Sequence, residues 1–225
     1  MEIILASASA RRSSLLREWG IPFRAIAAHG VDESAVTGAA AEVATELARR
    51  KAEAVARAIA VGTKGRPGRI YTVIGADTVV ELDGATLGKP RDREDARAML
   101  GRLAGRTHRV VTGVAVCRPG MAALVESETS DVMFHALSDS QIDAVLATGD
   151  WEGKAGAYGI QSEGRSLVAG FRGCYLNIVG LPMRRVIRLL QASGAASALP
   201  EGLPDCGCAR HPLSRGGEGA CPERR

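Results

Sequence analysis

The clearest chemical candidates begin near the N-terminus, where a short apolar run passes into small residues and two arginines. The segment reads Leu5-Ala-Ser-Ala-Ser-Ala-Arg-Arg12. Small residues let backbone N–H groups approach a ligand, and a helix N-terminus attracts anions. Two guanidinium groups at that end oppose the helix dipole unless they bind an anion. Two interpretations are open: a phosphate site that includes Ser7, Arg11 and Arg12, or two solvated arginines at a helix cap.

A single carboxylate interrupts the apolar run Val73-Ile-Gly-Ala-Asp-Thr-Val-Val80. An unpaired buried carboxylate is costly, so Asp77 needs a partner, a metal or a raised pKa. Such a group can be a general base for water or a ligand of a divalent metal, and the residues alone do not decide between the two. The plainer alternative is a bulge in which Asp77 caps backbone amides, and we favour a functional role over it.

Two lysines and one glutamate complete the charged candidates. Helical periodicity over residues 40–61 places Lys51 in the middle of an apolar stripe, while the other charges fall on the opposite face. A lysine there must snorkel, pair or face a cleft, and we favour the cleft. Lys89 lies in the restrained turn Gly88-Lys-Pro90 and could meet phosphate, although turn lysines are more often simply exposed. Glu33 is a candidate metal-site carboxylate, although loop acids are usually solvated.

A glycine-rich segment follows much later in the chain, Gly153-Lys-Ala-Gly-Ala-Tyr-Gly-Ile-Gln161. Its amide, Gln161, can both donate and accept hydrogen bonds, which suits the edge of a nucleotide base. Lys154 could be a further anion contact. Because glycine loops are common, this segment is a weak signal when taken alone.

These residues need a scaffold, and the apolar patterning predicts one that mixes strands and helices. Strands are predicted over residues 1–6, 23–28, 71–82, 108–117, 124–134, 167–171 and 174–179. Helices are predicted over residues 13–19, 40–61, 92–103, 138–147 and 182–191. Asp83-Gly84 predicts a tight hairpin turn. Strands and helices alternate at first and two long strands then follow each other, which favours a mixed α/β sheet over a doubly wound one.

The composition excludes several classes of function. The chain has 225 residues, of which 46% are hydrophobic and 24% charged, as in ordinary globular proteins. Only 4% are aromatic, and the net charge of +4 is not gathered into a basic block, which argues against a nucleic-acid polymer as partner. Apolar runs stay well short of the roughly 20 residues that a membrane helix needs. Since the N-terminus also lacks a signal-peptide pattern, we expect a cytoplasmic protein without membrane contact.

Residues 193–225 differ from the rest of the chain. They are rich in Gly, Pro, Ala and Ser with little periodicity, so we expect a largely disordered tail after a body of residues 1–192. Four soft ligands in this tail could in principle bind zinc: Cys206, Cys208, His211 and Cys221. Their spacing does not match the usual zinc-finger pattern, which favours disorder.

Taken together, the segments of the body resemble the Maf family of nucleoside triphosphate pyrophosphatases. The matching pieces occur in the order of the family: Leu5–Arg12, Leu47–Ala52, Ile74–Val80, Gly88–Pro90, Gly105–His108 with Thr112-Gly113, Ala155–Gln161 and Asn177–Pro182. They span residues 2 to 192 approximately, so the resemblance covers the body and not the tail. The family usually has proline where this chain has Ala10, a departure that removes no side-chain chemistry.

The resemblance implies an elongated mixed α/β fold of the inosine-triphosphatase-like type, with two lobes around a nucleotide cleft. It implies hydrolysis of a nucleoside triphosphate to the monophosphate and pyrophosphate, a divalent cation (Mg²⁺ or Mn²⁺) and a homodimer. Arg12, Thr78 and Gln161 match positions linked to base choice in the branch acting on dTTP and UTP, whose substrates could extend to modified pyrimidine nucleotides. Asp77 matches the proposed catalytic acid/base of the family.

The charged candidates fit this chemistry. Four basic side chains could surround a triphosphate: Arg11, Arg12, Lys51 and Lys89. Asp77 and Glu33 could hold a metal that also binds the phosphates. Two alternatives stay open, namely a 7-methyl-GTP pyrophosphatase of the same family and a non-catalytic nucleotide-binding regulator of septum formation and cell division.

Overall fold

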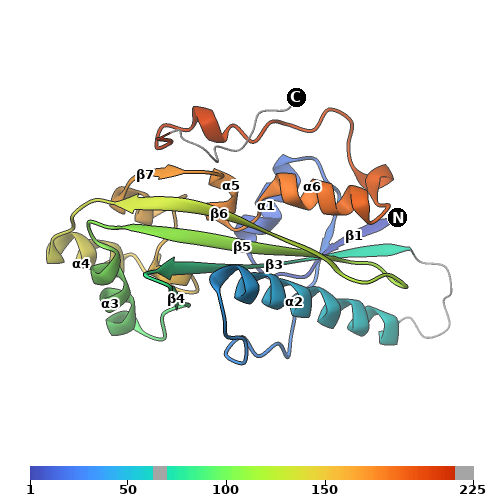
Figure 1. The fold of residues 1–225 in the computed structure, drawn as a ribbon, viewed down its shortest axis with the longest axis horizontal. Coiled ribbons are helices and arrows are strands. Elements are labelled where there is room, and N and C mark those ends of the chain that lie inside the picture. The colour runs from blue at the N-terminus through green and yellow to red at the C-terminus, as the bar shows by residue number, and fades with distance from the viewer. Residues whose placement is uncertain (63–69, 216–225) are drawn as a thin grey trace.

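One mixed β-sheet runs along the molecule (Figure 1). The computed structural model describes residues 1–62 and 70–215. Within them the strand order is β2-β1-β3-β5-β6-β7, and β4 pairs with β3 beside this path. The strands are β1 (Glu2–Leu5), β2 (Arg24–Ala25), β3 (Tyr71–Leu82), β4 (Ala85–Leu87), β5 (Thr107–Cys117), β6 (Leu124–Phe134) and β7 (Val168–Arg172). Because β1 pairs parallel with β2 and β3 while β3, β5 and β6 pair antiparallel, the predicted mixed sheet is confirmed.

Three long strands, β3, β5 and β6, give the sheet its elongated shape (Figure 1). Strand β3 turns directly into β4 at Asp83 and Gly84, whose φ angles are 55° and 79°. Left-handed backbone at both central residues is what a type I′ hairpin turn requires. The predicted hairpin is therefore confirmed.

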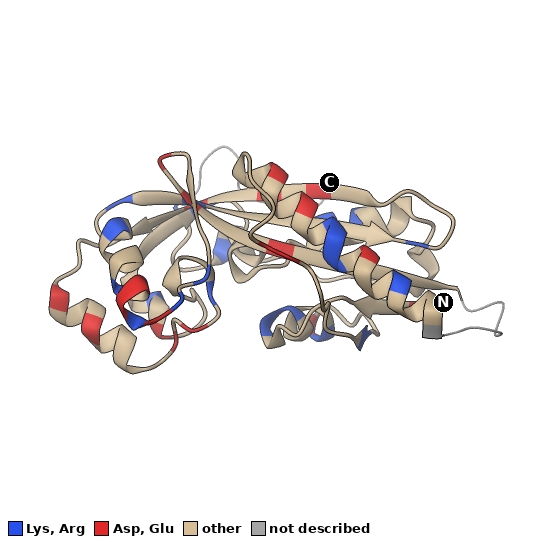
Figure 2. Cartoon of the chain, turned by 90° about the horizontal axis from the view of Figure 1, so that it is seen from below, with Lys and Arg blue, Asp and Glu red and all other residues tan. Residues whose placement is uncertain are grey.

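Helices cover both faces of this sheet (Figure 1). They are α1 (Ala10–Glu18), α2 (Ala40–Gly62), α3 (Arg93–Leu103), α4 (Asp139–Ala147), α5 (Tyr175–Val179) and α6 (Met183–Ala192). Helix α2 lies along β3 and β5 with its apolar stripe inward and charged residues along its outer side (Figure 2). The buried apolar residues of the other helices join one cluster on the opposite face of the sheet. The elongated sheet with flanking helices is thus as predicted.

Two glycines set the distance between α2 and the sheet. A Cβ atom on Gly75 in β3 would lie 2.1 Å from the backbone oxygen of Ala48, and one on Gly113 in β5 would lie 2.3 Å from that of Ala44. Real Cβ contacts are never this short, so only glycine lets the helix lie this close to the strands. The close approach brings Lys51, one turn after Ala48, over the middle of β3.

The prediction of a strand over residues 174–179 is wrong, because the structure has the short helix α5 there. Its apolar run is too short for periodicity to separate a buried strand from a buried helix. The deciding contacts come from elsewhere in the chain, since the buried side chain of Asn177 accepts from the backbone N–H of Thr112 at 3.0 Å and donates to the Val110 carbonyl at 2.9 Å. Gly180, with φ 114°, then ends the helix in the left-handed region.

The part of the tail that the structure describes, as far as Arg215, lies against the body, which differs from the expected disorder. The backbone N–H of Phe171 in β7 donates to the Leu213 carbonyl, and the Arg215 N–H donates back to Phe171, both at 2.9 Å. Cys208 is buried, and His211 stacks on Tyr175 with ring centroids 4.1 Å apart. These contacts pair distant segments, so local composition could not reveal them. The body boundary at residue 192 stays a prediction, and Cys221 lies outside the described residues.

Neither a membrane-spanning helix nor a preformed cluster of metal ligands occurs in the described part of the chain. Over residues 1–62 and 70–215, helices with the length and apolar character to span a bilayer are absent. In the same residues, His, Cys, Asp and Glu side chains do not gather in threes around a position suited to a metal ion.

Candidate active site

A cavity of about 480 Å³ opens where the start of α1, the middle of β3 and the 153–160 segment meet. Its size falls in the range of small-molecule sites. It is lined by eight of the nine predicted site residues: Ser7, Arg11, Arg12, Glu33, Lys51, Asp77, Thr78 and Lys89. Gln161 is the ninth; its side chain is exposed and does not line the cavity. The structure thus brings together residues from five separate segments of the chain.

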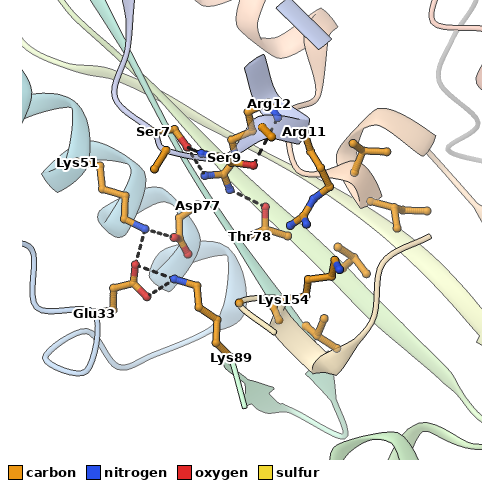
Figure 3. A pocket seen from close by; sticks show the side chains of 18 of the residues that line it. Ser7, Ser9, Arg11, Arg12, Glu33, Lys51, Asp77, Thr78, Lys89 and Lys154 are labelled. Carbon is orange, nitrogen blue, oxygen red and sulfur yellow. Dashed lines mark hydrogen bonds and ion pairs between the residues drawn. The ribbon is translucent and has the colours of Figure 1, made fainter. Parts of the chain in front are cut away.

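Lys51 is the centre of the charge network in this cavity (Figure 3). Its Nζ donates to Asp77 Oδ1 at 2.5 Å and to Glu33 Oε1 at 2.6 Å. Lys89, beyond the β4 hairpin, donates to the second Glu33 oxygen at 2.9 Å. The Lys51 side chain is only 13% exposed, so the lysine that interrupts the apolar stripe of α2 faces the cleft and is paired there.

The loop carboxylate of Glu33 is held ionised by these lysines. Partial burial on its own raises the pKa of Glu33, but hydrogen bonds from Lys51 and Lys89 outweigh it and lower the pKa to about 2. Glu33 therefore carries its negative charge at any physiological pH. The side chain of Glu33 is exposed, as is usual for a loop acid, but it is paired with two lysines from different elements.

Most of the N–H groups of Arg12 donate hydrogen bonds to protein atoms. Its Nε donates to the Gly180 carbonyl and its Nη1 to the Ala76 carbonyl, both at 2.8 Å, and its Nη2 donates to Thr78 Oγ1 at 3.1 Å. Burial lowers the pKa of Arg12, although the nearby charge of Asp77 acts in the other direction. A guanidinium fixed at three points by α5, β3 and a threonine is a rigid positive wall at the back of the cavity.

A chain of hydrogen bonds supports Thr78 from behind. Its hydroxyl lies 3.0 Å from that of Thr112, which donates to the Asn177 carbonyl at 2.9 Å. Thr112 and Asn177 are fully buried. Arg12 and Thr78 are thereby held in one orientation.

The opposite wall comes from the glycine-rich segment. Gly156 donates its N–H to the Gly88 carbonyl at 3.0 Å, which ties this segment to the turn that carries Lys89. Tyr158 is buried beside the cavity, and its hydroxyl lies 2.7 Å from His108 Nε2. The contact of His108 with Tyr158 could not be predicted from the sequence, because the two residues lie 50 positions apart.

The buried His108 should make the stability of the folded protein depend on pH. Burial lowers its pKa from 6.5 to about 4, and its Nδ1 lacks a partner among the described residues. His108 is therefore protonated below about pH 6.5 in the unfolded chain, but only below about pH 4 in the folded protein. The unfolding free energy should fall by about 3 kcal/mol as the pH drops through this window. Chemical denaturation at stepped pH measures this, and His108→Gln, which keeps a partner for Tyr158 without titrating, should flatten the slope.

The control for that prediction is His135→Gln, since His135 is exposed and directly follows β6. Its pH profile should follow that of the unaltered protein. A His108→Gln profile as steep as the original would show that another group causes the loss of stability.

Asp77 and Glu33 are the residues able to hold a divalent cation here. One oxygen of each already converges on a single cationic atom, Lys51 Nζ. Mg²⁺ is usually held by one or two carboxylates together with substrate phosphates rather than by a cage made only of protein. Two convergent carboxylates beside several cationic side chains match that pattern, so the donor set fits a cation that arrives with a phosphate ligand.

Several known proteins are similar to this chain in sequence or in fold. The family described as Maf-like protein matches residues 2–193. A dTTP/UTP pyrophosphatase of Symbiobacterium thermophilum is 48% identical over 194 residues, which cover 86% of this chain and 94% of that protein. A dTTP/UTP pyrophosphatase of Pelotomaculum thermopropionicum is 44% identical over 86% of this chain and 97% of its own length. Among solved structures, the Staphylococcus aureus Ham1 protein has a TM-score of 0.44 at 20% identity and covers 60% of this chain and 72% of that one.

Proposed function

This chain belongs to the Maf-like protein family, and from that premise we propose that it hydrolyses dTTP and UTP, with modified pyrimidine nucleotides as further substrates, to the monophosphate and pyrophosphate. One observation carries the proposal: a cavity of nucleotide size has one carboxylate on its strand wall and basic side chains on every side. Among its described lining residues the basic ones are Arg11, Arg12, Lys51, Lys89 and Lys154. Relatives at 48% and 44% identity bear the name of this activity.

The basic side chains suit a triphosphate because they approach from opposite sides. Lys51 and Lys89 lie on one side of the cavity and Arg11 on the other, with Arg12 behind (Figure 3). The small residues of the Ser7–Ala10 segment let the chain pass close to the ligand. Charge-assisted hydrogen bonds from ammonium and guanidinium groups to phosphate are among the strongest that proteins make.

Hydrolysis needs a water molecule activated beside the α-phosphorus, and Asp77 is the candidate base. Lys51 donates to its Oδ1, and among the described residues Oδ2 accepts no hydrogen bond, so that oxygen is open to water. As the water oxygen bonds to the α-phosphorus, its proton passes to Asp77 and the bond to the bridging oxygen breaks. Pyrophosphate leaves with the negative charge, which the surrounding cations stabilise.

We propose Mg²⁺ or Mn²⁺ as the cofactor, held by Asp77 and Glu33 together with the substrate. A divalent cation on the triphosphate neutralises charge that builds up as pyrophosphate departs. Removal of divalent ions with EDTA should lower turnover at least about 100-fold, since such a cation supplies several kcal/mol of charge stabilisation. Addition of excess Mg²⁺ or Mn²⁺ should restore it, whereas full turnover in EDTA would exclude a metal requirement.

The deciding assay measures pyrophosphate release from each ribo- and deoxyribonucleoside triphosphate, and from 7-methyl-GTP, with Mg²⁺ or Mn²⁺. We expect dTTP and UTP to give the highest kcat/KM. A preference for 7-methyl-GTP would assign the other branch of the family. Nucleotide binding without turnover of any substrate would favour the regulator of septum formation instead.

We also propose that residues 1–192 form the catalytic unit and that the protein acts in the cytoplasm. The family resemblance further implies a homodimer. A chain truncated after residue 192 should keep the turnover of the full chain. Sedimentation equilibrium of the full chain reports the oligomeric state, and a purely monomeric protein would exclude the dimer.

A further inference from the structure

A carboxylate outside the cavity lining holds both ends of the glycine-rich wall. Asp150, which lies just after α4, accepts from Lys154 Nζ on Oδ1 at 2.5 Å. Its other oxygen, Oδ2, accepts from Ser162 Oγ at 2.7 Å and from the Gly164 backbone N–H at 3.4 Å. One side chain thus joins the beginning of the segment to its end, and Tyr158 lies between them.

This contact is shielded from water. The Asp150 and Lys154 side chains are 15% and 12% exposed. Partial burial on its own raises the pKa of Asp150, but hydrogen bonds from Lys154 and Ser162 outweigh it and lower the pKa. An ion pair at this depth is screened less than a surface pair, so Asp150 constrains where the lysine ammonium lies.

Lys154 is the member of this group that reaches the cavity. It lines the cavity across from Lys51 and Lys89, on the side of Arg11 (Figure 3). An ammonium has three donors, and Lys154 gives two of them to Asp150, one to the carboxylate and one to the backbone carbonyl. One donor is left for a ligand, and the flexible stem is already ordered before any ligand arrives.

The same carboxylate acts on Arg11. Burial lowers the pKa of Arg11, and the charge of Asp150 raises it. The negative charge of Asp150 thus acts on Arg11 as well as on Lys154.

We propose that Asp150 is a positioning residue that fixes Lys154 as a phosphate-binding group on the wall opposite Lys51. The ligand class is a linear polyphosphate, and the identification of that polyphosphate as part of a nucleoside triphosphate rests on the proposed function. Asp150 acts through Lys154, because its Oδ1 holds the lysine ammonium in place. Asp150 therefore contributes more to binding of the polyphosphate than to the rate of the chemical step.

The test is a double-mutant cycle between Asp150→Asn and Lys154→Met. Calorimetry without metal measures the Kd of inorganic tripolyphosphate, and steady-state kinetics measures kcat and KM for UTP. Each single variant should raise the Kd and the KM about tenfold, because the loss of one charge-assisted hydrogen bond weakens binding by about that factor. The kcat should change less than about threefold. The double variant should be no worse than Lys154→Met alone.

A matched control removes a different contact of the same carboxylate. Ser162→Ala leaves the pair of Asp150 with Lys154 intact, so its Kd for tripolyphosphate should stay within about twofold of the original. If Asp150→Asn loses its cooperative melting transition, Asp150→Glu takes its place. The longer side chain shifts the carboxylate, which should weaken tripolyphosphate binding when Lys154 is present and leave it unchanged in the Lys154→Met background.

Three results would overturn the proposal: Asp150→Asn binding tripolyphosphate as the original does, additive effects in the double variant, or an original protein that binds no tripolyphosphate. Two further outcomes distinguish a failure of the proposed function from a failure of the role of Asp150. If the original protein hydrolyses no nucleoside triphosphate and the cycle is still non-additive, Asp150 positions Lys154 in a polyphosphate-binding protein of another kind. If UTP is hydrolysed and the cycle is additive, only the role of Asp150 is refuted.

Discussion

Replacement of Asp77 by asparagine should lower kcat for UTP by about 10²- to 10⁴-fold, the usual contribution of a general base. The amide keeps an oxygen that can accept from Lys51, and Glu33 still pairs with the same ammonium at 2.6 Å. The cavity should therefore keep its shape while the group that takes the proton from water is lost. Pyrophosphate release under saturating UTP and Mg²⁺ measures the effect, and the KM should change far less than kcat.

The matched control is Glu81→Gln, which makes the same change of acid to amide on the same strand. Glu81 is buried outside the cavity, where it pairs with Arg109 and accepts from the Gly84 N–H. Its loss should affect stability and leave turnover near the original value. Turnover by Asp77→Asn within about tenfold of the original would remove Asp77 from the role of base.

The candidate site was predictable where a residue broke the pattern of its own element. Asp77 is the only acid in an apolar run and Lys51 the only charge in an apolar stripe, and each break costs free energy that a function must offset. Asp150 breaks no local pattern, because a polar residue after a helix is ordinary. Its role depends on Lys154 and Ser162 meeting it in space, which spacing alone does not reveal.

The long elements of the fold were also predictable from the sequence. Strand β3 was placed at its observed bounds because twelve residues of apolar, largely β-branched sequence leave little choice, and the hairpin after it follows from Asp83 and Gly84. Helix α5 was missed because five residues hold little periodicity and its conformation is set by the bonds of Asn177 to β5. Local sequence therefore fixes long elements, whereas short ones depend on the partners they meet.

Gly75→Ala should be among the most destabilising single changes in the chain. The new Cβ would lie 2.1 Å from the Ala48 backbone oxygen, and a helix backbone cannot yield as a flexible side chain can. We expect a loss of about 3 kcal/mol, at the upper end for overpacked cores. For a chain of this size that corresponds to a fall in Tm of about 6–12 °C, which calorimetry or circular dichroism measures.

The same change should lower turnover even at temperatures where the protein stays folded. Lys51 lies one turn beyond Ala48 on α2, and Asp77 lies two residues beyond Gly75 on β3, so a helix pushed off the strand separates the two partners that now lie 2.5 Å apart. Gly101→Ala is the control, because a Cβ there meets open space on α3 and should stabilise the helix by about 0.5–1 kcal/mol. If Gly75→Ala melts near the original temperature, α2 can shift without cost, and the close helix–strand contact does not set the position of Lys51.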